Sequence, residues 1–421
     1  MGHPGSDAAA ERPFDVAVIG LGYVGLPTAA ILATHGLRVA GVDLSDRVVA
    51  TINAGAIHIV EPELDALVRA AVADGALQAF TATQAARAHL ICVPTPLGAD
   101  HRPDLRHVDA ASRALAPRLR RGDLVVLEST VPPGTTRSIV GARIREAGLE
   151  IGRDVFVAHA PERVLPGAVL REVVDNERVV GGLTDACTAR AAAFYARFVK
   201  GEIHRASAET AELVKLAENA YRDVNIAFAN ELAKVCDHVD LDPWEVIRLA
   251  NRHPRVEILR PGPGVGGHCI AVDPWFIAAS APGRTPLIRQ ARAINDARPG
   301  EVVAAIYARL GVDGPRSPAR ARPAVALLGL AYKPDIDDLR ESPALEVARR
   351  LVADDRVEVL LVEPHLGRSP IDGQALHDPE AALFAADLAV VLVAHRRFRD
   401  LDRRPGLEIL DCVGLWRGGG R

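Results

Sequence analysis

A glycine-rich segment near the start of the chain is the feature that most limits how it can fold. A short apolar run, D-V-A-V-I (15–19), is followed directly by G-L-G-Y-V-G and then by an apolar helical stretch that ends at Ala33. A second run, R-V-A-G-V, begins at Arg38 and is followed by Asp43. Strand, glycine turn, helix, strand and terminal acid in this order are typical of the βαβ unit that binds dinucleotides. The segment therefore predicts an α/β fold built on a parallel sheet.

The glycine turn and the acid also indicate the ligand of this unit. Glycines allow the tight turn and let a pyrophosphate sit on the helix N-terminus. Asp43 can accept hydrogen bonds from ribose hydroxyls and repels a 2′-phosphate, so NAD is favoured over NADP. Arg47, four residues later, weakens that preference. The expected contacts from the turn itself are Gly20, Gly22, Tyr23, Val24 and Gly25.

Polar residues follow three more expected strands, within 89–93, 123–130 and 155–163. Ligands of doubly wound sheets bind beyond the carboxyl ends of such strands. Ordinary turn chemistry explains Thr95 and Ser129 equally well, whereas Glu162 follows a fully apolar strand and is favoured as a functional residue. The residues at this edge are Thr95, Glu128, Ser129, Thr130, Glu162, Arg163 and Val164.

A long helix is expected at about 208–239. Helical spacing predicts an apolar face made of Leu213, Leu216, Ala217, Ala220, Val224, Ala227 and Phe228. A polar stripe faces the other way and consists of Glu212, Lys215, Asn219, Arg222 and Asn230. Such a stripe is usually solvated, but its asparagines also fit burial against another element. Lys215 and Asn219 are four residues apart and project together. A helix of this length suits a domain linker or a dimer interface.

A basic corner follows a short helix within 242–255 and consists of Arg252, His253 and Arg255. Cations beside a glycine-rich loop suit an anionic ligand such as a diphosphate. The next segment, P-G-P-G-V-G-G-H-C-I-A-V-D-P-W (261–275), is too rich in glycine and proline for a helix or a central strand.

Two interpretations of the segment 261–275 stay open. Glycine lets backbone approach a ligand closely, and the segment also carries a thiol, Cys269, and a carboxylate, Asp273. These features favour an active-site loop. The alternative is a tight connector in which the cysteine serves as a small buried hydrophobe.

A second α/β pattern follows a linker-like segment at 311–322. Its expected strands lie at 324–330, 357–362, 388–393 and 407–411, and a helix is expected at 343–352. The turn after the first of these strands lacks the glycine fingerprint and presents Lys333 and Arg340. We therefore expect two Rossmann-like doubly wound domains, at 13–205 and 320–421, joined by a long helix and a helical middle domain at 206–310.

Composition narrows the class of protein. The five cysteines are scattered without a C-x-x-C pair, which argues against structural zinc or a disulfide framework and favours a reducing compartment. The net charge of −4 gives no nucleic-acid footprint and no attraction to anionic membranes. Residues 1–12 lack the basic region of a secretory signal. These features predict a cytoplasmic protein without a bound metal.

The combination resembles the UDP-glucose/GDP-mannose dehydrogenase superfamily over about 13–417. The segments that carry the resemblance are I-H-I-V-E-P-E-L (57–64), P-E-R-V-L-P-G (161–167), E-N-A-Y-R-D-V-N-I-A-F-A-N-E-L (218–232), L-A-N-R-H-P-R-V (249–256), the cysteine loop (261–276) and D-D-L-R-E-S-P (337–343). The resemblance implies an NAD-dependent enzyme that oxidises the C6 alcohol of a UDP-sugar to a carboxylate. It also implies a homodimer formed through the central helix.

The resemblance assigns roles to individual residues. Cys269 is implied to attack the sugar aldehyde and to carry a thiohemiacetal and then a thioester. Lys215 and Asn219 are implied to stabilise oxyanions, Asp273 and Thr130 to work with an ordered water, and Glu162 to act as general base in hydrolysis. Lys333 matches a substrate contact, and Arg340 matches a residue on the NAD side. The remaining expected substrate contacts are Arg163, Val164, Arg252, His253, Arg255, Gly262, Gly266 and His268.

Three positions depart from the pattern of UDP-glucose dehydrogenases. Pro166 stands where those enzymes carry a second glutamate, and Val48 stands where they carry a basic residue. His268 replaces their serine, either as a base for Cys269 or in a packing or N-acetyl-contact role. The residues disfavour two other function classes: a two-electron dehydrogenase has no need of the cysteine, and a non-catalytic nucleotide-binding protein has no need of Lys215, Asn219, Cys269 and Asp273 together.

Overall fold

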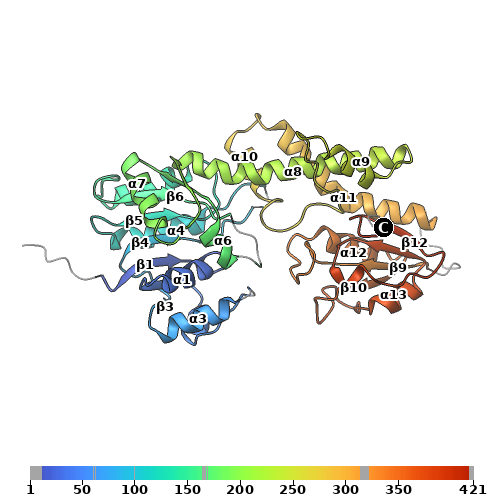
Figure 1. Cartoon of the computed structure of the whole chain (residues 1–421), viewed down its shortest axis with the longest axis horizontal. Coiled ribbons are helices and arrows are strands. Elements are labelled where there is room, and N and C mark those ends of the chain that lie inside the picture. The colour runs from blue at the N-terminus through green and yellow to red at the C-terminus, as the bar shows by residue number, and fades with distance from the viewer. Residues whose placement is uncertain are drawn as a thin grey trace, which may run out of the picture. The chain divides into compact units, whose positions relative to one another are not determined.

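The computed structural model describes residues 12–59, 61, 63–98, 100–163, 167, 169–312 and 322–416. Most of the expected linker, and also Val164 and Pro166, lie outside these residues. Backbone contacts divide the chain into two compact units: Met1–Ala217 with Trp275–Ser280, and Glu218–Pro274 with Ala281–Arg421 (Figure 1). The expected three-domain boundaries stay a prediction.

The first unit is built on one eight-stranded sheet in the order β3-β2-β1-β4-β5-β6-β7-β8. Its strands are parallel except for β6 and β7, which pair antiparallel. The strands are β1 (Phe14–Ile19), β2 (Val39–Val42), β3 (Leu77–Phe80), β4 (Ala86–Ile91), β5 (Leu124–Leu127), β6 (Phe156–His159), β7 (Arg178–Gly182) and β8 (Ile203–Ser207). Strands β2 and β5 are apolar throughout and fully buried, as expected where both faces of a parallel sheet are covered.

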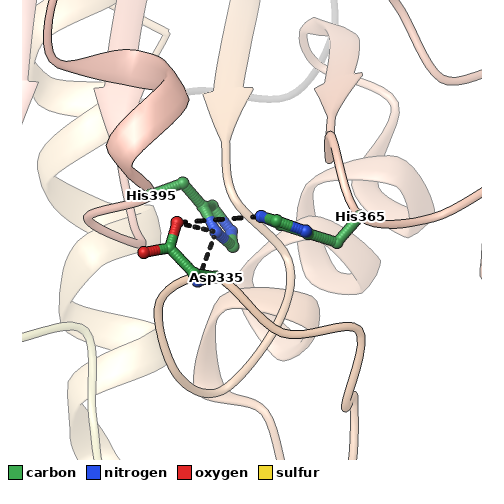
Figure 2. A group of neighbouring side chains, drawn as sticks. All are labelled: Asp335, His365 and His395. Atoms are coloured by element: carbon green, nitrogen blue, oxygen red, sulfur yellow. Dashed lines mark hydrogen bonds and ion pairs between the residues drawn. The ribbon is translucent and has the colours of Figure 1, made fainter. Parts of the chain in front are cut away.

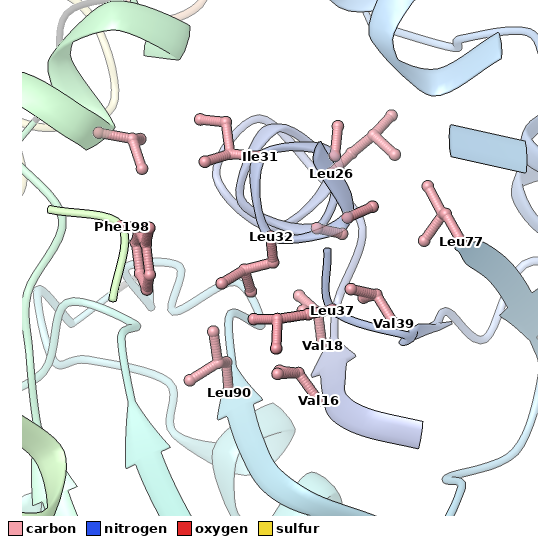
Figure 3. Packing of buried hydrophobic residues seen from close by; sticks show 14 of the residues in the cluster. Val16, Val18, Leu26, Ile31, Leu32, Leu37, Val39, Leu77, Leu90 and Phe198 are labelled. Carbon is pink, nitrogen blue, oxygen red and sulfur yellow. The ribbon is translucent and has the colours of Figure 1, made fainter. Parts of the chain in front are cut away.

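Helices cover the sheet of the first unit. They are α1 (Gly25–Thr34), α2 (Asp46–Asn53), α3 (Leu64–Ala73), α4 (Arg106–Leu115), α5 (Gly141–Glu146), α6 (Val169–Asp175) and α7 (Asp185–Tyr195). Figure 3 shows Leu32 of α1 on the side of the helix that faces the central strands, near Val18 and Leu90, while Leu26 and Ile31 lie on the opposite side of the helix in the same buried cluster. This packing fixes the start of α1 against the carboxyl edge of the sheet, where the glycine turn lies.

The long helix α8 (Ala208–His238) is present as expected and continues from the first unit into the second. Its burial differs from the expected apolar face: Leu213 and Phe228 are 43% and 53% exposed. Glu212, Asn219 and Asn230 of the polar stripe are instead buried. The reason is that these side chains pair with polar backbone and side-chain groups of other segments, which helical spacing alone does not reveal.

The second unit contains a four-stranded parallel sheet in the order β10-β9-β11-β12. Its elements are α9 (Pro243–Ala250), α11 (Pro286–Leu310), β9 (Ala324–Leu328), α12 (Pro343–Asp354), β10 (Glu358–Val362), α13 (Pro379–Ala385), β11 (Leu388–Val391) and β12 (Glu408–Asp411). The mostly parallel first sheet, the parallel second sheet and the helices that accompany them confirm the α/β class.

One boundary of the cysteine loop is corrected by the structure. Asp273, Pro274 and Trp275 do not belong to an irregular segment but form the first turn of α10 (Asp273–Ser280). Proline is tolerated in the first turn of a helix because the backbone N–H groups of that turn have no acceptor within the helix. The N–H that proline lacks therefore costs no helical hydrogen bond.

Candidate active site

The glycine turn after β1 has the geometry that the sequence predicts. Gly20 adopts a φ of +93°, and a Cβ atom there would lie 2.7 Å from the carbonyl oxygen of Cys92. A Cβ atom on Gly25 would lie 1.9 Å from the carbonyl oxygen of Gly20, so this contact also requires glycine. A Cβ atom on Gly22 would meet nothing within 4 Å. The first and third glycines therefore close the turn, while the second leaves open space beside the helix N-terminus.

Asp43 is tied to the same turn. Its Oδ2 accepts a hydrogen bond from the backbone N–H of Leu21 at 3.1 Å, and its Oδ1 accepts one from Ser45 at 2.9 Å. Each carboxylate oxygen has a second acceptor site, so capacity remains for ribose hydroxyls. Arg47 and Tyr23 are exposed, and Val24 is half-buried. These residues fit a bound dinucleotide.

Two hydroxyls at the carboxyl edge donate to backbone. Thr95 Oγ1 donates to the carbonyl of Thr130 at 2.7 Å, and Ser129 Oγ donates to the carbonyl of Val93 at 2.7 Å. Both hydroxyl groups therefore make the hydrogen bonds to backbone that are ordinary in turns. Their oxygen lone pairs can still accept hydrogen bonds from a ligand. The side chain of Thr130 is half-buried.

Glu128 turns inward rather than towards the ligand edge where the sequence places it. The residue is 3% exposed, and its carboxylate is surrounded by donors. Oε2 accepts from the thiol of Cys92 at 3.2 Å, and Oε1 accepts from the hydroxyl of Tyr195 at 2.5 Å. The guanidinium of Arg178 lies 3.6 Å from the same Oε1. Neither Tyr195 nor Arg178 stands in a motif, and sequence reasoning missed both.

Glu162 shares this cluster. Its Oε2 accepts from Arg178 Nη2 at 2.7 Å, and its Oε1 accepts from the backbone N–H of Arg163 at 2.8 Å. The side chain of Glu162 is 8% exposed. A carboxylate held in this way has a fixed orientation and keeps one acceptor site on each oxygen.

The polar stripe of α8 begins with Glu212 in the first unit. This carboxylate accepts from the backbone of Gly134 and Thr136 at 2.5 and 2.7 Å and from the hydroxyl of Thr136 at 2.6 Å. Glu212 therefore fixes the segment that follows β5. Lys215, one turn further along α8, is half-buried.

Asparagines of the same helix hold the chain that leads into the cysteine loop. Asn225 donates to the carbonyl of Glu257 at 2.8 Å and accepts from the N–H of Leu259 at 2.9 Å. Asn230 accepts from the N–H of Gly262 at 2.9 Å. Side-chain amides are suited to this task because each offers both a donor and an acceptor to backbone.

Asn219 contacts Asp273, which lies four residues after Cys269. Its Nδ2 donates to Oδ2 of Asp273 at 2.6 Å, and both residues are buried. The carbonyl of Cys269 accepts from the N–H groups of Val272 and Asp273 at 3.0 and 2.9 Å. Cys269 itself is half-buried. Within the second unit, the structure thus brings together Asn219, Cys269 and Asp273.

The loop also packs against the turn that follows β9. A Cβ atom on Gly266 would lie 2.6 Å from the carbonyl oxygen of Glu341, and one on Gly267 would lie 2.8 Å from the ring of Tyr332. The N–H of Gly267 donates to the carbonyl of Arg340 at 3.2 Å. The glycines are therefore required by contacts within the protein, whatever ligand also approaches them.

His268 is exposed and faces the carboxylate of Asp338. Burial opposes the ionisation of Asp338, but Arg340 and, more weakly, His268 hold the pKa of its carboxyl below the ordinary value. Arg340 is paired with Asp338 at 2.5 Å, and Lys333 in the same turn is half-buried. The basic corner, Arg252, His253 and Arg255, is exposed after α9.

Glu363 occupies the position in the second sheet that Asp43 occupies in the first. It follows β10 and accepts from the N–H groups of Leu330 and Ala331 at 2.7 and 3.0 Å. Burial opposes its ionisation, but His395 and these N–H groups hold the pKa of Glu363 below the ordinary value. The turn after β9 is therefore closed by an acid, as the glycine turn is.

Asp335, His365 and His395 lie together beside this turn, with the imidazole of His395 pointing towards Asp335 (Figure 2). Nδ1 of His395 accepts from the N–H of Asp335 at 2.9 Å, and Nε2 lies 3.1 Å from Glu363. Both ring nitrogens of His395 are thus engaged, which disfavours metal ligation by this histidine. Asp335 also accepts from Arg396 Nε at 2.8 Å. The group holds the turn that carries Lys333.

Comparisons with known proteins cover almost the whole chain. Three models of the UDP-glucose/GDP-mannose dehydrogenase family match: the NAD binding domain at 14–199, the central domain at 209–297 and the UDP binding domain at 326–410. An NDP-N-acetyl-D-galactosaminuronic acid dehydrogenase of Ralstonia solanacearum is 49% identical over 97% of this chain and 98% of its own.

Two other similar proteins carry a second sugar name. A UDP-N-acetyl-D-mannosamine dehydrogenase of Yersinia pestis is 49% identical over 96% of this chain and 99% of its own. The solved structure of a UDP-D-ManNAc dehydrogenase from Pyrococcus horikoshii aligns with a TM-score of 0.85 at 37% identity, covering 95% of this chain and 96% of its own. Among the described residues, no helix is long and apolar enough to span a membrane.

Proposed function

Because the chain belongs to the UDP-glucose/GDP-mannose dehydrogenase family, we propose that it oxidises the C6 alcohol of UDP-N-acetyl-D-mannosamine to the carboxylate. Membership of the family makes the chain an NAD-dependent nucleotide-sugar dehydrogenase and confirms the resemblance seen in the sequence. The sugar is the part that we propose, and the Yersinia pestis and Pyrococcus horikoshii relatives support it. UDP-N-acetylglucosamine and other UDP-sugars are the alternatives.

The observation that carries the proposal is the cysteine loop. A thiol that serves only as packing needs no defined polar surroundings. Cys269 instead follows a segment that asparagines of α8 hold at several points, and the helix that begins four residues later carries a buried Asp273 bonded to Asn219 at 2.6 Å. This arrangement is suited to covalent catalysis, which a four-electron oxidation of an alcohol uses and a two-electron oxidation does not.

The glycine turn and Asp43 would hold NAD⁺, and bound NAD⁺ would supply the hydride acceptor for each of the two oxidations. In our proposal, the residues of this chain carry out the covalent and proton-transfer steps. The thiol of Cys269 adds to the aldehyde carbon and loses its proton. The resulting thiohemiacetal is oxidised to a thioester, and water then forms a C–O bond as the C–S bond breaks. The overall balance is one alcohol, two NAD⁺ and one water giving one carboxylate, two NADH and three protons.

We propose the following division of labour. Lys215 and Asn219 stabilise the oxyanions that develop at C6, and one such donor is typically worth about 3 kcal/mol. Asp273 and Thr130 hold the ordered water and its proton, and Glu162 accepts a proton during thioester hydrolysis. Lys333 and the basic corner, Arg252, His253 and Arg255, bind the diphosphate and the sugar.

We also propose that the chain forms a homodimer through α8. Tyr221, Phe228 and Val235 are 61%, 53% and 57% exposed and follow one another at intervals of seven residues, with Val239 at 52% one turn further. A heptad stripe of this kind is typical of helices that pair with a like helix. A second copy of the chain therefore fits this surface.

The product is a nucleotide-activated uronate, and glycosyltransferases use such compounds as donors. We propose that this one is made in the cytoplasm as a precursor of a bacterial surface polysaccharide.

The experiment that tests the proposal measures NADH by absorbance with UDP-N-acetylmannosamine, UDP-N-acetylglucosamine, UDP-N-acetylgalactosamine, UDP-glucose and GDP-mannose. We expect the highest kcat/KM for UDP-N-acetylmannosamine and two NADH for each sugar consumed. One NADH for each sugar contradicts the four-electron reaction. Preference for another sugar contradicts only the substrate.

The role of the thiol is tested by Cys269→Ala. We expect loss of uronate formation with unchanged NAD⁺ binding in calorimetry. Cys412→Ala is the matched control, because this cysteine is also half-buried but lies outside the loop. Uronate formation at the wild-type rate by the Cys269 variant removes the thiol from the mechanism.

A further inference from the structure

The first unit contains a buried polar cluster that the reaction does not yet use. It joins the ends of three strands to α7 and consists of Cys92, Glu128, Arg178 and Tyr195. The side chains of Glu128 and Arg178 are 0% and 5% exposed. Burying charged groups to this degree is costly unless each is paired, and here each is paired more than once.

Arg178 stands between two carboxylates. Its Nη1 lies 3.6 Å from Oε1 of Glu128, and its Nη2 donates to Oε2 of Glu162 at 2.7 Å. The guanidinium also lies over the ring of Tyr195, 4.8 Å from the ring centre. Contacts on both edges and on one face leave the guanidinium a single orientation.

Glu128 is the anchor of the cluster. Its carboxylate accepts from the thiol of Cys92 and the hydroxyl of Tyr195 and faces Arg178. Burial raises the pKa of Glu128, the charge of Arg178 acts in the opposite direction, and the charge of Glu162 adds to the rise. The two carboxylates therefore repel each other, and Arg178 is the cation that contacts both.

The geometry points to Arg178 as a positioning residue: held by Glu128 and Tyr195, it orients the carboxylate of Glu162 for the hydrolytic step, and the charge of Glu128 sets the pH range of that step. The inference rests on the proposed role of Glu162. In that step water forms a C–O bond to the acyl carbon, the C–S bond to Cys269 breaks, and Glu162 takes the proton from water. Arg178 touches neither the water nor the acyl group.

A purely structural role for the cluster predicts different behaviour. Loss of any member then lowers stability without changing which intermediate accumulates or at which pH the reaction slows. Positioning predicts opposite effects from the two neighbours of Glu162. Removal of the positive charge of Arg178, which donates to Glu162 at 2.7 Å, disfavours the ionised carboxylate, whereas removal of the negative charge of Glu128 favours it, each by about one pH unit.

The experiment uses the full-length enzyme with NAD⁺ and UDP-N-acetylmannosamine, or the best substrate from the panel. Arg178→Met is expected to lower kcat at least tenfold, to leave both KM values within about twofold and to shift the acid limb of kcat about one unit to higher pH. Intact-protein mass spectrometry of quenched samples should then show an acyl group on Cys269. Arg178→Lys should restore part of the rate.

Glu128→Gln is expected to shift the pH profile in the opposite direction. This variant tests the positioning role even if the Arg178 variants do not fold. It should shift the acid limb about one unit to lower pH. Asp123→Asn is the matched control, because Asp123 is buried at the other end of β5, with its side chain 1% exposed. This control should leave the acid limb unchanged.

Two results separate failure of the inference from failure of the function on which it rests. Acyl-enzyme that accumulates in Glu162→Gln, together with an unshifted acid limb in Glu128→Gln, overturns the positioning role alone. No acyl-enzyme in Glu162→Gln removes Glu162 from hydrolysis and overturns both.

Discussion

Replacement of Gly266 by alanine tests how the cysteine loop is held. The new Cβ atom would lie 2.6 Å from the carbonyl oxygen of Glu341 and 2.8 Å from both Cδ of Pro343 and Cβ of Tyr332. None of these atoms is the far end of a flexible side chain, so the loop and the turn must separate. Overpacking of this kind typically costs about 1–3 kcal/mol.

The matched control is Gly262→Ala. A Cβ atom at this position would have no neighbour closer than 3.9 Å, and the residue does not adopt a positive φ. We therefore expect Gly266→Ala to lower the midpoint of thermal unfolding by roughly 2–12 °C, since 1 kcal/mol shifts it by about 2–4 °C in a domain of about 200 residues. Gly262→Ala should lower it by no more than about 1 °C, because Gly262 is buried but the added methyl group meets no neighbour closer than 3.9 Å.

The two variants also separate packing from ligand contact. If backbone at Gly262 touches the sugar nucleotide, as we propose, Gly262→Ala raises the KM for the UDP-sugar while the affinity for NAD⁺ in calorimetry stays unchanged. Scanning calorimetry and steady-state kinetics on both proteins measure these effects. Equal thermal midpoints for the two variants would refute the contact between the loop and the turn after β9.

Further predictions follow from other contacts. Gly25→Ala should abolish NAD⁺ binding in calorimetry, because its Cβ atom would lie 1.9 Å from the carbonyl oxygen of Gly20; retained affinity would contradict the turn geometry. Burial lowers the pKa of His89 to about 4 and that of His159 to about 3. The unfolded histidines bind protons below about pH 6.5, so urea unfolding should show stability falling by about 1.4 kcal/mol per pH unit for each histidine from pH 6.5 down to their folded values; a flat profile would contradict this. Phe228→Glu should convert a dimer to a monomer in light scattering if α8 forms the interface, and an unchanged mass would exclude it.

Local patterns predicted several features of the chain because they do not depend on distant residues. The glycine turn is one case: Gly25 must be glycine because a Cβ atom there would meet the carbonyl oxygen of Gly20, five residues earlier. The length of α8 is another, since helical periodicity runs unbroken through it. The same pattern could not predict that the asparagines of α8 are buried. Periodicity indicates which residues share a face of the helix but not what covers that face.

The candidate site likewise combines features that local sequence predicts with features that only tertiary structure decides. The sequence alone determined the dinucleotide turn with Asp43, the α/β class and the pairing of a thiol with an acid in one glycine-rich loop, since each lies within a short segment. Tertiary structure alone decided that Glu128 points inward to Cys92 and Tyr195 and that Asn219 holds Asp273. These contacts join residues 36 to 67 positions apart in the chain. No local preference encodes them, because a buried carboxylate or amide finds its partners only once the strands and helices that carry them have packed.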